Sequence, residues 1–553
     1  MRRISQKKFG TILVVTQALV LTTLLSACGS AGSNDSTSSV SSPSASSLGV
    51  ASANGTTATT ESGFTVTGPI NGGEHKQPFG AYFGDMKKLG YVEEEYFVEG
   101  VAQRYEPVGN LTPDGKWNLK PDDTAPYKTR ILVRRPIDPA KFNGTVLMEW
   151  ANVSNGYEIS FADPHGLYQN GFAYVSVSAQ PLGVEGYEDN NQGLKAWDPD
   201  RYDSLSIPDD GVSYDIFTQA ARAIGPNRKG DVDPMGGLPV KKLIAIGGSQ
   251  SGNRVLAYAN GVQPIEHTFD ALMPMLEAGS ASDFERELAH ADVTKHSRVV
   301  KAKVRDDLKT PVMKINTQTE GLFYVPLRQP DTDLYRSWEI AGASHAPTRQ
   351  MELIRQKTDR DGLTNSLDTY SPYRSSDVNW LYTVDAAILH VHDWINGGEA
   401  PPSMKPLEIA SNGMDYSYDE FGNAKGGVRL PELEVPIARY AVSPVYGLGG
   451  FTIPFTAEQL KKLYPTHDDY VAKVKAAAEA AEKAGVILPY RADEYIRAAK
   501  AAPIPTPAMP DLPEGIGYNE EGPTDPIIAY VTLPDQNKRT GKTSDNSLSL
   551  PVQ

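Results

Sequence analysis

The sequence predicts an α/β fold in which a mostly parallel sheet is flanked by helices. Short apolar runs typical of buried strands alternate with helical patterns between about residues 127 and 345. The chain has 553 residues, 40% of them hydrophobic and 22% charged, which is ordinary for a globular protein with a large core. The 49 glycines and 41 prolines predict many turns and long surface loops.

The predicted elements follow one another along the chain. We expect strands at 127–133, 145–150, 172–177, 243–246, 267–273, 311–316 and 337–341. We expect helices at 214–224, 254–259, 380–396 and 470–484. The helix at 380–396 has one apolar stripe, and two glycines end it: Leu381, Val384, Ile388, Val391 and Ile395, then Gly397 and Gly398. The segment Thr456-Ala-Glu-Gln459 predicts a capping box.

The N-terminus predicts export and a lipid anchor. A basic start precedes a mostly apolar stretch from Phe9 to Leu25, which is short for a membrane span. The next residues, Leu25-Ser26-Ala27-Cys28-Gly29, resemble a bacterial lipobox, which implies lipidation of the Cys28 thiol and a place in the cell envelope. Cys28 is the only cysteine, so neither a disulfide nor a multi-cysteine metal site can form within the chain. The alternative is an ordinary signal peptide with a chance cysteine.

Four segments are expected along the chain. Residues 1–27 are the lipoprotein signal peptide, and 28–62 are a Ser/Gly/Thr linker too poor in apolar residues to order itself. Residues 63–405 are the α/β core, in which the polar segment 282–307 interrupts the alternation and is a candidate lid. Residues 406–553 are a C-terminal helical extension that packs on the core and ends in a Pro-rich tail. The sequence indicates no oligomeric state.

The segment from Lys242 to Arg254 predicts a nucleophile. It reads KLIAIGGSQSGNR, a buried strand, a Gly/Ser turn and a helix, which is the setting of a nucleophile elbow. Ser249 follows the two glycines and is the expected nucleophile, whereas the competing Ser251 would already lie in the helix. Position 251 is a serine where the G-x-S-x-G pattern has glycine, which keeps the side chain small.

A serine nucleophile needs a base that is itself oriented by an acid. Glu320 follows the strand at 311–316 and His345 follows the strand at 337–341, so both should reach the same rim of the sheet as Ser249. Three other acids stay open as alternatives: Asp331, Asp333 and Glu277.

The oxyanion of the acyl-transfer intermediate needs two backbone N–H donors. The first should be the N–H of Gln250, the residue after the nucleophile. The second should come from the loop after the strand at 145–150, where Asn152 or Val153 is the candidate.

Other classes of function lack support in the sequence. The net charge of −15 disfavours a nucleic-acid partner, because that binding needs basic residues to neutralise phosphates. The pair His390 and His392 lies within a predicted helix, where a two-residue step rotates the side chains by about 200°, so no shared metal is expected. Glycine-rich nucleotide-binding motifs are absent, and we expect no cofactor.

Taken together, these residues resemble the bacterial α/β-hydrolase-domain family with a G-x-S-Q-S-G elbow. The resemblance covers most of 63–500, including Glu149-Trp-Ala-Asn-Val-Ser154, Val177-Ser-Ala-Gln180, Trp338-Glu-Ile-Ala-Gly342 and the segments 90–100 and 421–429. It implies an α/β-hydrolase fold with Ser249, Glu320 and His345 on the triad positions, and it implies no particular substrate.

We therefore expect a serine esterase that cleaves a small-molecule carboxylic ester through an acyl-enzyme. Lactone or amide hydrolysis and acyl transfer are alternatives on the same triad. A non-catalytic surface-binding lipoprotein is the alternative from another class.

Overall fold

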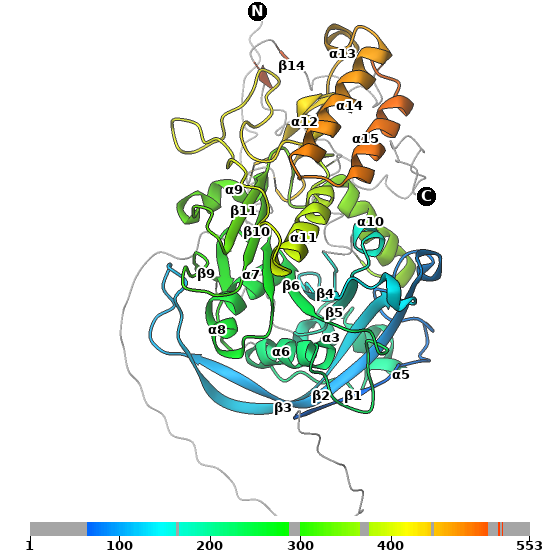
Figure 1. Cartoon of the computed structure of the whole chain (residues 1–553), viewed down its shortest axis with the longest axis vertical. Helices are drawn as coiled ribbons and strands as arrows, with labels where there is room; N and C mark the ends of the chain where they lie inside the picture. The colour runs from blue at the N-terminus through cyan, green and yellow to red at the C-terminus, as the bar shows by residue number, and fades with distance from the viewer. Residues whose placement is uncertain are drawn as a thin grey trace, which may run out of the picture.

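The computed structural model describes residues 63–161, 165–286, 299–364, 375–443 and 447–506, and the backbone of 518–519 and 522–523. Its main feature is a nine-stranded sheet in the order β1-β2-β3-β5-β4-β6-β7-β10-β11 (Figure 1). The strands are β1 (Phe64–Thr67), β2 (Tyr91–Pro107), β3 (Leu119–Pro136), β4 (Thr145–Trp150), β5 (Ala173–Val177), β6 (Lys242–Gly248), β7 (Ala271–Met275), β10 (Val312–Thr317) and β11 (Tyr335–Ile340). From β5 to β11 all neighbours are parallel, which confirms the predicted mostly parallel sheet.

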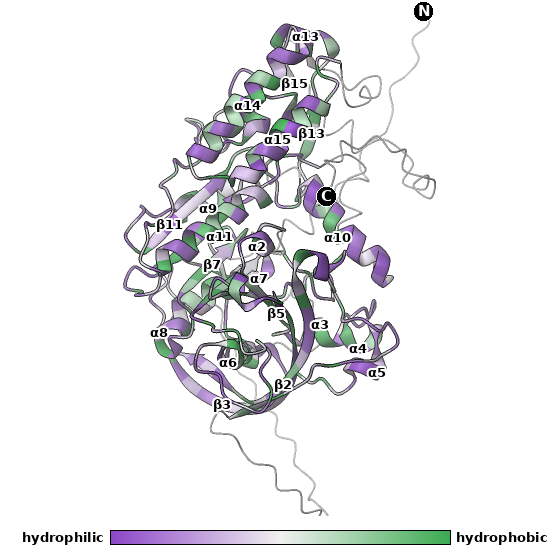
Figure 2. Ribbon diagram, turned by 45° about the vertical axis from the view of Figure 1, so that its right-hand side comes forward, coloured by the Kyte–Doolittle hydropathy of each residue, from purple (hydrophilic) through white to green (hydrophobic). Residues whose placement is uncertain are grey.

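The parallel strands are buried on both faces. Every residue of β4, β5, β7 and β10 is buried, as expected of strands covered by helices on either side. Figure 2 shows mainly hydrophobic residues, in green, along the central strands and both hydrophobic and hydrophilic residues on the outer helices. The strand predicted at 267–273 begins only at Ala271, because the helix α8 (Gln263–Glu266) precedes it and His267 ends that helix with a φ of 47°.

The long β2–β3 hairpin is the largest departure from the predicted elements. It is antiparallel, and Figure 1 shows it curving along the edge of the molecule far from the C-terminal helices. Apolar residues predict only its buried part, near 127–133. The preceding part of β3, residues 119–126, is mostly exposed and contains no apolar run.

The helices cover the parallel strands and build a separate layer at one end. Those nearest the sheet are α2 (His165–Gln169), α3 (Pro181–Glu185), α4 (Leu194–Trp197), α5 (Pro199–Tyr202), α6 (Ser213–Ile224), α7 (Gln250–Ala257), α9 (Gln318–Tyr324), α10 (Thr348–Asp361) and α11 (Leu381–Ile395). Toward the C-terminus follow α12 (Pro431–Glu434), α13 (Ala457–Leu463), α14 (His467–Lys483) and α15 (Pro489–Ala501). Buried Val384, Ile388 and Val391 confirm the stripe of α11, and Thr456 forms the predicted capping box with Gln459.

The segment after residue 405 packs directly on the sheet. Val428 bridges to Ile340 on the outer strand β11, and Leu407 N–H donates to the Glu339 carboxylate. Beyond this contact lie the β12–β13 pair (Ala438–Ala441 and Phe451–Pro454) and helices α13–α15, which Figure 1 shows at one end of the molecule. Residues of this segment, among them Leu430 and Ala481, belong to the same buried apolar cluster as the strands.

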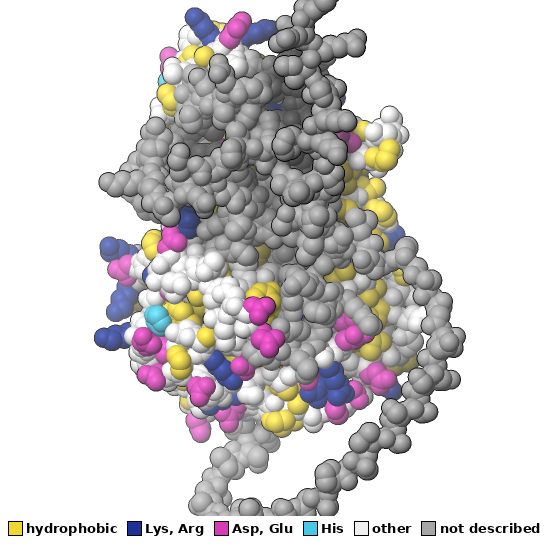
Figure 3. Space-filling view, turned by 180° about the vertical axis from the view of Figure 1, so that it is seen from behind, with side chains coloured by type: hydrophobic (Ala, Val, Ile, Leu, Met, Phe, Trp, Pro, Cys, Tyr) yellow, Lys and Arg dark blue, Asp and Glu magenta, His cyan; other side chains and the backbone are white. Residues whose placement is uncertain are grey.

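Several predictions fall partly or wholly outside the described residues. These are the signal peptide, Cys28, the linker at 28–62 and most of the Pro-rich tail. Of the candidate lid at 282–307, the structure describes the two ends, where β8 (Ser280–Ser282) pairs with β9 (Val299–Lys301). Within the described parts of the chain, no helix has the length and apolar character needed to span a bilayer. On the face seen in Figure 3, the described acidic and basic side chains intermingle along the lower rim.

Candidate active site

Ser249 occupies the sharp turn between β6 and α7. Its φ of 60° and ψ of −123° lie in a region that residues other than glycine rarely adopt. Ser249 N–H donates to Met275 O at 3.0 Å, and Asn253 N–H donates to Ser249 O at 3.0 Å. Such backbone strain persists only where the surroundings hold it, and it is found most often at active sites.

The small residues around Ser249 are needed by the close packing of the turn. A Cβ at Gly247 would lie 2.5 Å from Ser251 O, and a Cβ at Gly252 would lie 2.2 Å from Met275 O. Ser251 is fully buried, and its Oγ donates to Gly248 O and accepts Gly248 N–H, both at 3.0 Å. The Ser251 hydroxyl therefore closes the turn from inside, while Ser249 is only partly buried.

Glu320 and His345 meet directly. Both are buried, and His345 Nδ1 lies 2.7 Å from Glu320 Oε1. The second oxygen of Glu320 accepts hydrogen bonds from Thr317 N–H at 2.9 Å and Thr317 Oγ1 at 2.5 Å. Burial alone would raise the pKa of Glu320, but the neighbouring His345 and the hydrogen bonds from His345 and Thr317 bring it below its ordinary value.

Glu320 also serves the helix in which it lies. Thr317 is the N-cap of α9, and Glu320 is its third residue, so the pair forms a capping box. The pattern Thr-x-x-Glu after a strand is a capping signal that is visible in the sequence. The capping box holds the carboxylate at the C-terminal end of β10, where it faces His345.

The turn at Ser249 and the Glu320–His345 pair share one neighbour, Phe161. The Phe161 and His345 rings meet edge to face with centroids 6.2 Å apart. The Phe161 ring also lies against Gly248, where an added Cβ would be 2.8 Å away. In the described residues no hydrogen bond joins Ser249 to His345, and catalytic hydrogen bonds are often long before substrate binds.

The rival acids lie in other settings. Asp331 and Asp333 precede β11, so that the length of this strand, about 20 Å at 3.3 Å per residue, separates them from the rim that carries His345. Asp331 lies 3.9 Å from Arg336 Nε. Glu277 pairs with the buried Lys314 at 2.7 Å, and burial raises the pKa of Glu277.

The two candidates for the second oxyanion donor differ in what their backbone N–H groups do. Asn152 N–H donates to Ile159 O at 3.0 Å in an isolated β-bridge, so it is already committed. The Asn152 side chain instead braces the turn by donating to Gly248 O at 2.9 Å. Val153 N–H makes a long contact of 3.5 Å with Gln250 Oε1, and the geometry therefore favours Val153 over Asn152. The first candidate donor, Gln250 N–H, is at the first residue of α7, where a helix supplies no acceptor.

A cavity of about 420 Å³ adjoins Phe161. Aromatic and aliphatic side chains form much of its wall, among them Phe79, Tyr157, Ile159, Phe161, Leu353 and Tyr382. Arg349 and Gln350, just beyond His345, also line it. The cavity thus reaches from the neighbourhood of His345 to the start of the helix α15, which contributes Arg491.

The two histidines of α11 point to different neighbours. His390 Nε2 donates to Gly485 O at 2.8 Å, while His392 Nδ1 lies 2.7 Å from Thr145 Oγ1. Across the described part of the chain, no three His, Cys, Asp or Glu side chains are grouped so that they could hold a metal ion.

The sequence of residues 66–497 matches the model of a family described as an alpha/beta hydrolase domain. The chain belongs to this family. The match spans the nine-stranded sheet from within β1 to β11 and runs on into α15, so the family comprises the C-terminal helices as well as the sheet.

Matches among solved structures include three hydrolases. The esterase Est22 is 11% identical with a TM-score of 0.28, and the match covers 50% of this chain and 80% of that one. An S-formylglutathione hydrolase from Staphylococcus aureus is 11% identical with a TM-score of 0.22, and the match covers 48% of this chain and 97% of that one. Acetyl xylan esterase 1 from Thermoanaerobacterium is 12% identical with a TM-score of 0.23, and the match covers 43% of this chain and 80% of that one. No curated protein matches the sequence.

Proposed function

We propose that this alpha/beta hydrolase domain protein is a serine esterase that cleaves carboxylic esters through an acyl-enzyme. The observation that carries the proposal is the 2.7 Å contact between Glu320 and His345 at the rim of the sheet where Ser249 is held at a positive φ. A buried, ionised carboxylate on one ring nitrogen of a histidine leaves the other nitrogen free to act as a base.

The proposed reaction has two steps. Ser249 Oγ attacks the acyl carbon while its proton passes to His345, and the alkoxide of the leaving group takes that proton and departs as the alcohol. Water then attacks the acyl carbon and gives a proton to His345, the bond between that carbon and Ser249 Oγ breaks, and His345 returns the proton to Ser249 Oγ as the acid leaves. Glu320 holds the orientation of His345 and stabilises its charged form, and the N–H groups of Gln250 and Val153 bind the oxyanion.

The apolar cavity beside Phe161 supports a substrate with an apolar acyl or alcohol group. Its aromatic wall, which includes the Phe161 ring that meets His345 edge to face, would bury such a group. Lactones and amides can react at the same three residues, so a panel of esters, lactones and amides separates these substrates.

Labelling with a fluorophosphonate tests the nucleophile. We expect the full chain to label and to hydrolyse p-nitrophenyl esters of graded length, and we expect Ser249→Ala to lose labelling and at least about 10⁴-fold in kcat. Ser204→Ala, an exposed serine outside the site, is the matched control and should behave as the unchanged chain does. Labelling that persists in Ser249→Ala would overturn the assignment, and an unlabelled, inactive wild type would favour a non-catalytic binding protein.

We further propose that the enzyme is exported and anchored by lipid at Cys28. The basic start, the apolar stretch and Leu-Ser-Ala-Cys support this proposal at the level of sequence. A protein held by two or more acyl chains stays at a membrane surface, so the ester substrate would be met in the cell envelope.

A further inference from the structure

A chain of side-chain amides connects the turn at Ser249 with a buried ion pair. Gln250 Oε1 accepts Val153 N–H at 3.5 Å, and Gln250 Nε2 donates to Gln180 Oε1 at 2.8 Å. Gln180 Nε2 donates to Asp210 Oδ1 at 3.2 Å, and Arg254 Nη2 donates to Asp210 Oδ2 at 2.6 Å. Gln180, Asp210 and Arg254 are all buried, so this end of the chain is shielded from water, whereas Gln250 is only partly buried.

Two groups with a single hydrogen-bonding role fix the direction of these amides. The indole N–H of Trp150 can only donate, and it lies 3.0 Å from Gln180 Oε1. The carboxylate of Asp210 accepts at the other end of the Gln180 amide. Gln180 must therefore present its oxygen to Gln250, so the NH2 of Gln250 faces Gln180 and the oxygen of Gln250 faces Val153.

The helix after the turn anchors the chain of amides at two points. Gln250 and Arg254 are four residues apart on α7 and so lie on the same face, one turn from each other. Gln250 reaches Gln180, the N-cap of α3. Arg254 reaches Asp210, which lies in the short 3-10 turn before α6. Both neighbouring loops are thus held against the helix that begins at the proposed oxyanion site.

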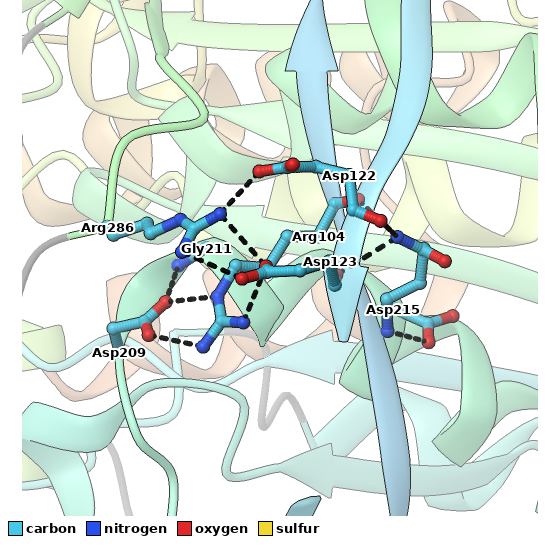
Figure 4. Close-up of polar contacts among 8 residues, drawn as sticks. Arg104, Asp122, Asp123, Asp209, Gly211, Asp215 and Arg286 are labelled. Carbon is cyan, nitrogen blue, oxygen red and sulfur yellow. Dashed lines mark hydrogen bonds and ion pairs between the residues drawn. The ribbon is translucent and has the colours of Figure 1, made fainter. Parts of the chain in front are cut away.

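A second group of charges clamps the loop that carries Asp210. Asp209 receives Arg104 Nε at 3.1 Å and Nη2 at 2.6 Å, and Figure 4 shows Arg104 between Asp209 and Asp123. Arg104 Nη1 donates to Asp123 at 2.8 Å, and Arg286 also reaches Asp123. Because Arg104 lies on β2 and Asp123 on β3, the loop is fixed to the long hairpin.

We propose that Gln250 positions the oxyanion hole through its side chain. Its backbone N–H is one oxyanion donor. Its side-chain oxygen accepts Val153 N–H, the second donor, and so holds that N–H near the first. A contact of 3.5 Å is weak, so Val153 N–H can turn to the negatively charged oxyanion, which is the stronger acceptor. This inference rests on the proposed serine esterase activity.

The test compares two substitutions at Gln250. Gln250→Met keeps the length of the side chain and removes both hydrogen bonds. We expect kcat to fall about 10- to 100-fold with KM within about threefold, because a misplaced donor loses part of the roughly 10²- to 10³-fold that one oxyanion donor contributes. The affinity for a trifluoromethyl ketone, which forms a tetrahedral adduct, should fall in parallel with kcat/KM.

Gln250→Glu supplies a readout that a merely structural role would not produce. When the new carboxyl group is ionised, it places an acceptor oxygen against Gln180 Oε1, whereas the protonated carboxyl group restores one donor and one acceptor. The ratio of the kcat of Gln250→Glu to that of the wild type should therefore rise as the pH is lowered. This variant also carries the test if Gln250→Met fails to fold.

The matched control is Gln263→Met. Gln263 is also buried, but its amide bonds to Phe269 away from the site, so its loss should lower the melting temperature and leave kcat within about twofold. A kcat of Gln250→Met within about threefold of wild type, or a pH-independent ratio for Gln250→Glu, would overturn the inference. If the wild type itself does not label at Ser249, the proposed function fails instead, so the two failures are distinguishable.

Discussion

At the residue scale, the buried carboxylate of Glu320 lies 2.7 Å from His345 Nδ1, and both residues follow a strand, as Ser249 does. The order of residue types along the chain therefore predicts these three residues, although it does not show their contacts. The sequence predicts Asn152 or Val153 as the second oxyanion donor, but it does not show that the Asn152 N–H already donates to Ile159 O through a bridge between two loop residues. A loop amide can be assigned as a donor only when its acceptors in the folded chain are known.

The identity of the acid is a prediction at this scale. We expect Glu320→Gln to lower kcat by about 10³- to 10⁴-fold, because an amide neither orients His345 in the same tautomer nor stabilises its positive charge. Asp331→Asn should stay within about threefold of wild type, since Asp331 lies at the opposite end of β11. Steady-state kinetics on one p-nitrophenyl ester measures both, and the reverse pattern would assign the role to Asp331.

At the element scale, the C-terminal ends of the parallel strands determine which residues lie at the rim that carries the candidate site. The strands β6, β10 and β11 run in the same direction, so their C-terminal ends carry Ser249, Glu320 and His345 to one edge. The strand β7 lies between β6 and β10, and Glu277 after it is held by Lys314. Apolar periodicity predicted these strands because they are buried on both faces, whereas the half-exposed β2 has no such run.

Two capping boxes allow a prediction that separates stability from activity. Thr317 and Thr456 are both N-caps whose third helical residue returns a hydrogen bond. Replacing either by alanine should lower the free energy of unfolding by about 1 kcal/mol. Only Thr317→Ala should also lower kcat, by about tenfold, because Thr317 holds the Glu320 carboxylate that faces His345.

Urea unfolding and ester kinetics on the two variants check this difference. Equal losses of kcat in Thr317→Ala and Thr456→Ala would mean that the capping box acts on stability alone. An unchanged kcat in both would show that Glu320 keeps its orientation without Thr317.

At the scale of the whole molecule, the C-terminal segment is built into the fold. Arg491 of α15 donates to Asp385 of α11 through Nε at 3.0 Å and Nη2 at 2.8 Å, and the Arg491 side chain also lines the cavity near Phe161. Val428 continues the sheet beyond β11. The family match from 66 to 497 agrees with a unit that includes these helices.

The anchor is the prediction that concerns the whole chain. When the wild type is expressed in bacteria that are fed an alkyne fatty acid, it should incorporate the label and sediment with membranes. Cys28→Ser should lose the label and leave the membrane fraction, because no other thiol is available. Ser30→Ala in the linker serves as the control and should behave as wild type. Label that persists in Cys28→Ser would show that the lipobox prediction is wrong.

The amino-acid sequence alone predicts the parallel strands, the turn around Ser249 and the candidates for base and acid. It can do so because buried strands appear as apolar runs and a tight turn demands small residues at defined positions. The folded chain is needed to show which amides are free, how Ser251 closes the turn, and how Trp150 and Asp210 orient Gln250 through Gln180. Those features depend on hydrogen bonds between segments far apart in the chain, and local patterns carry no record of such partners.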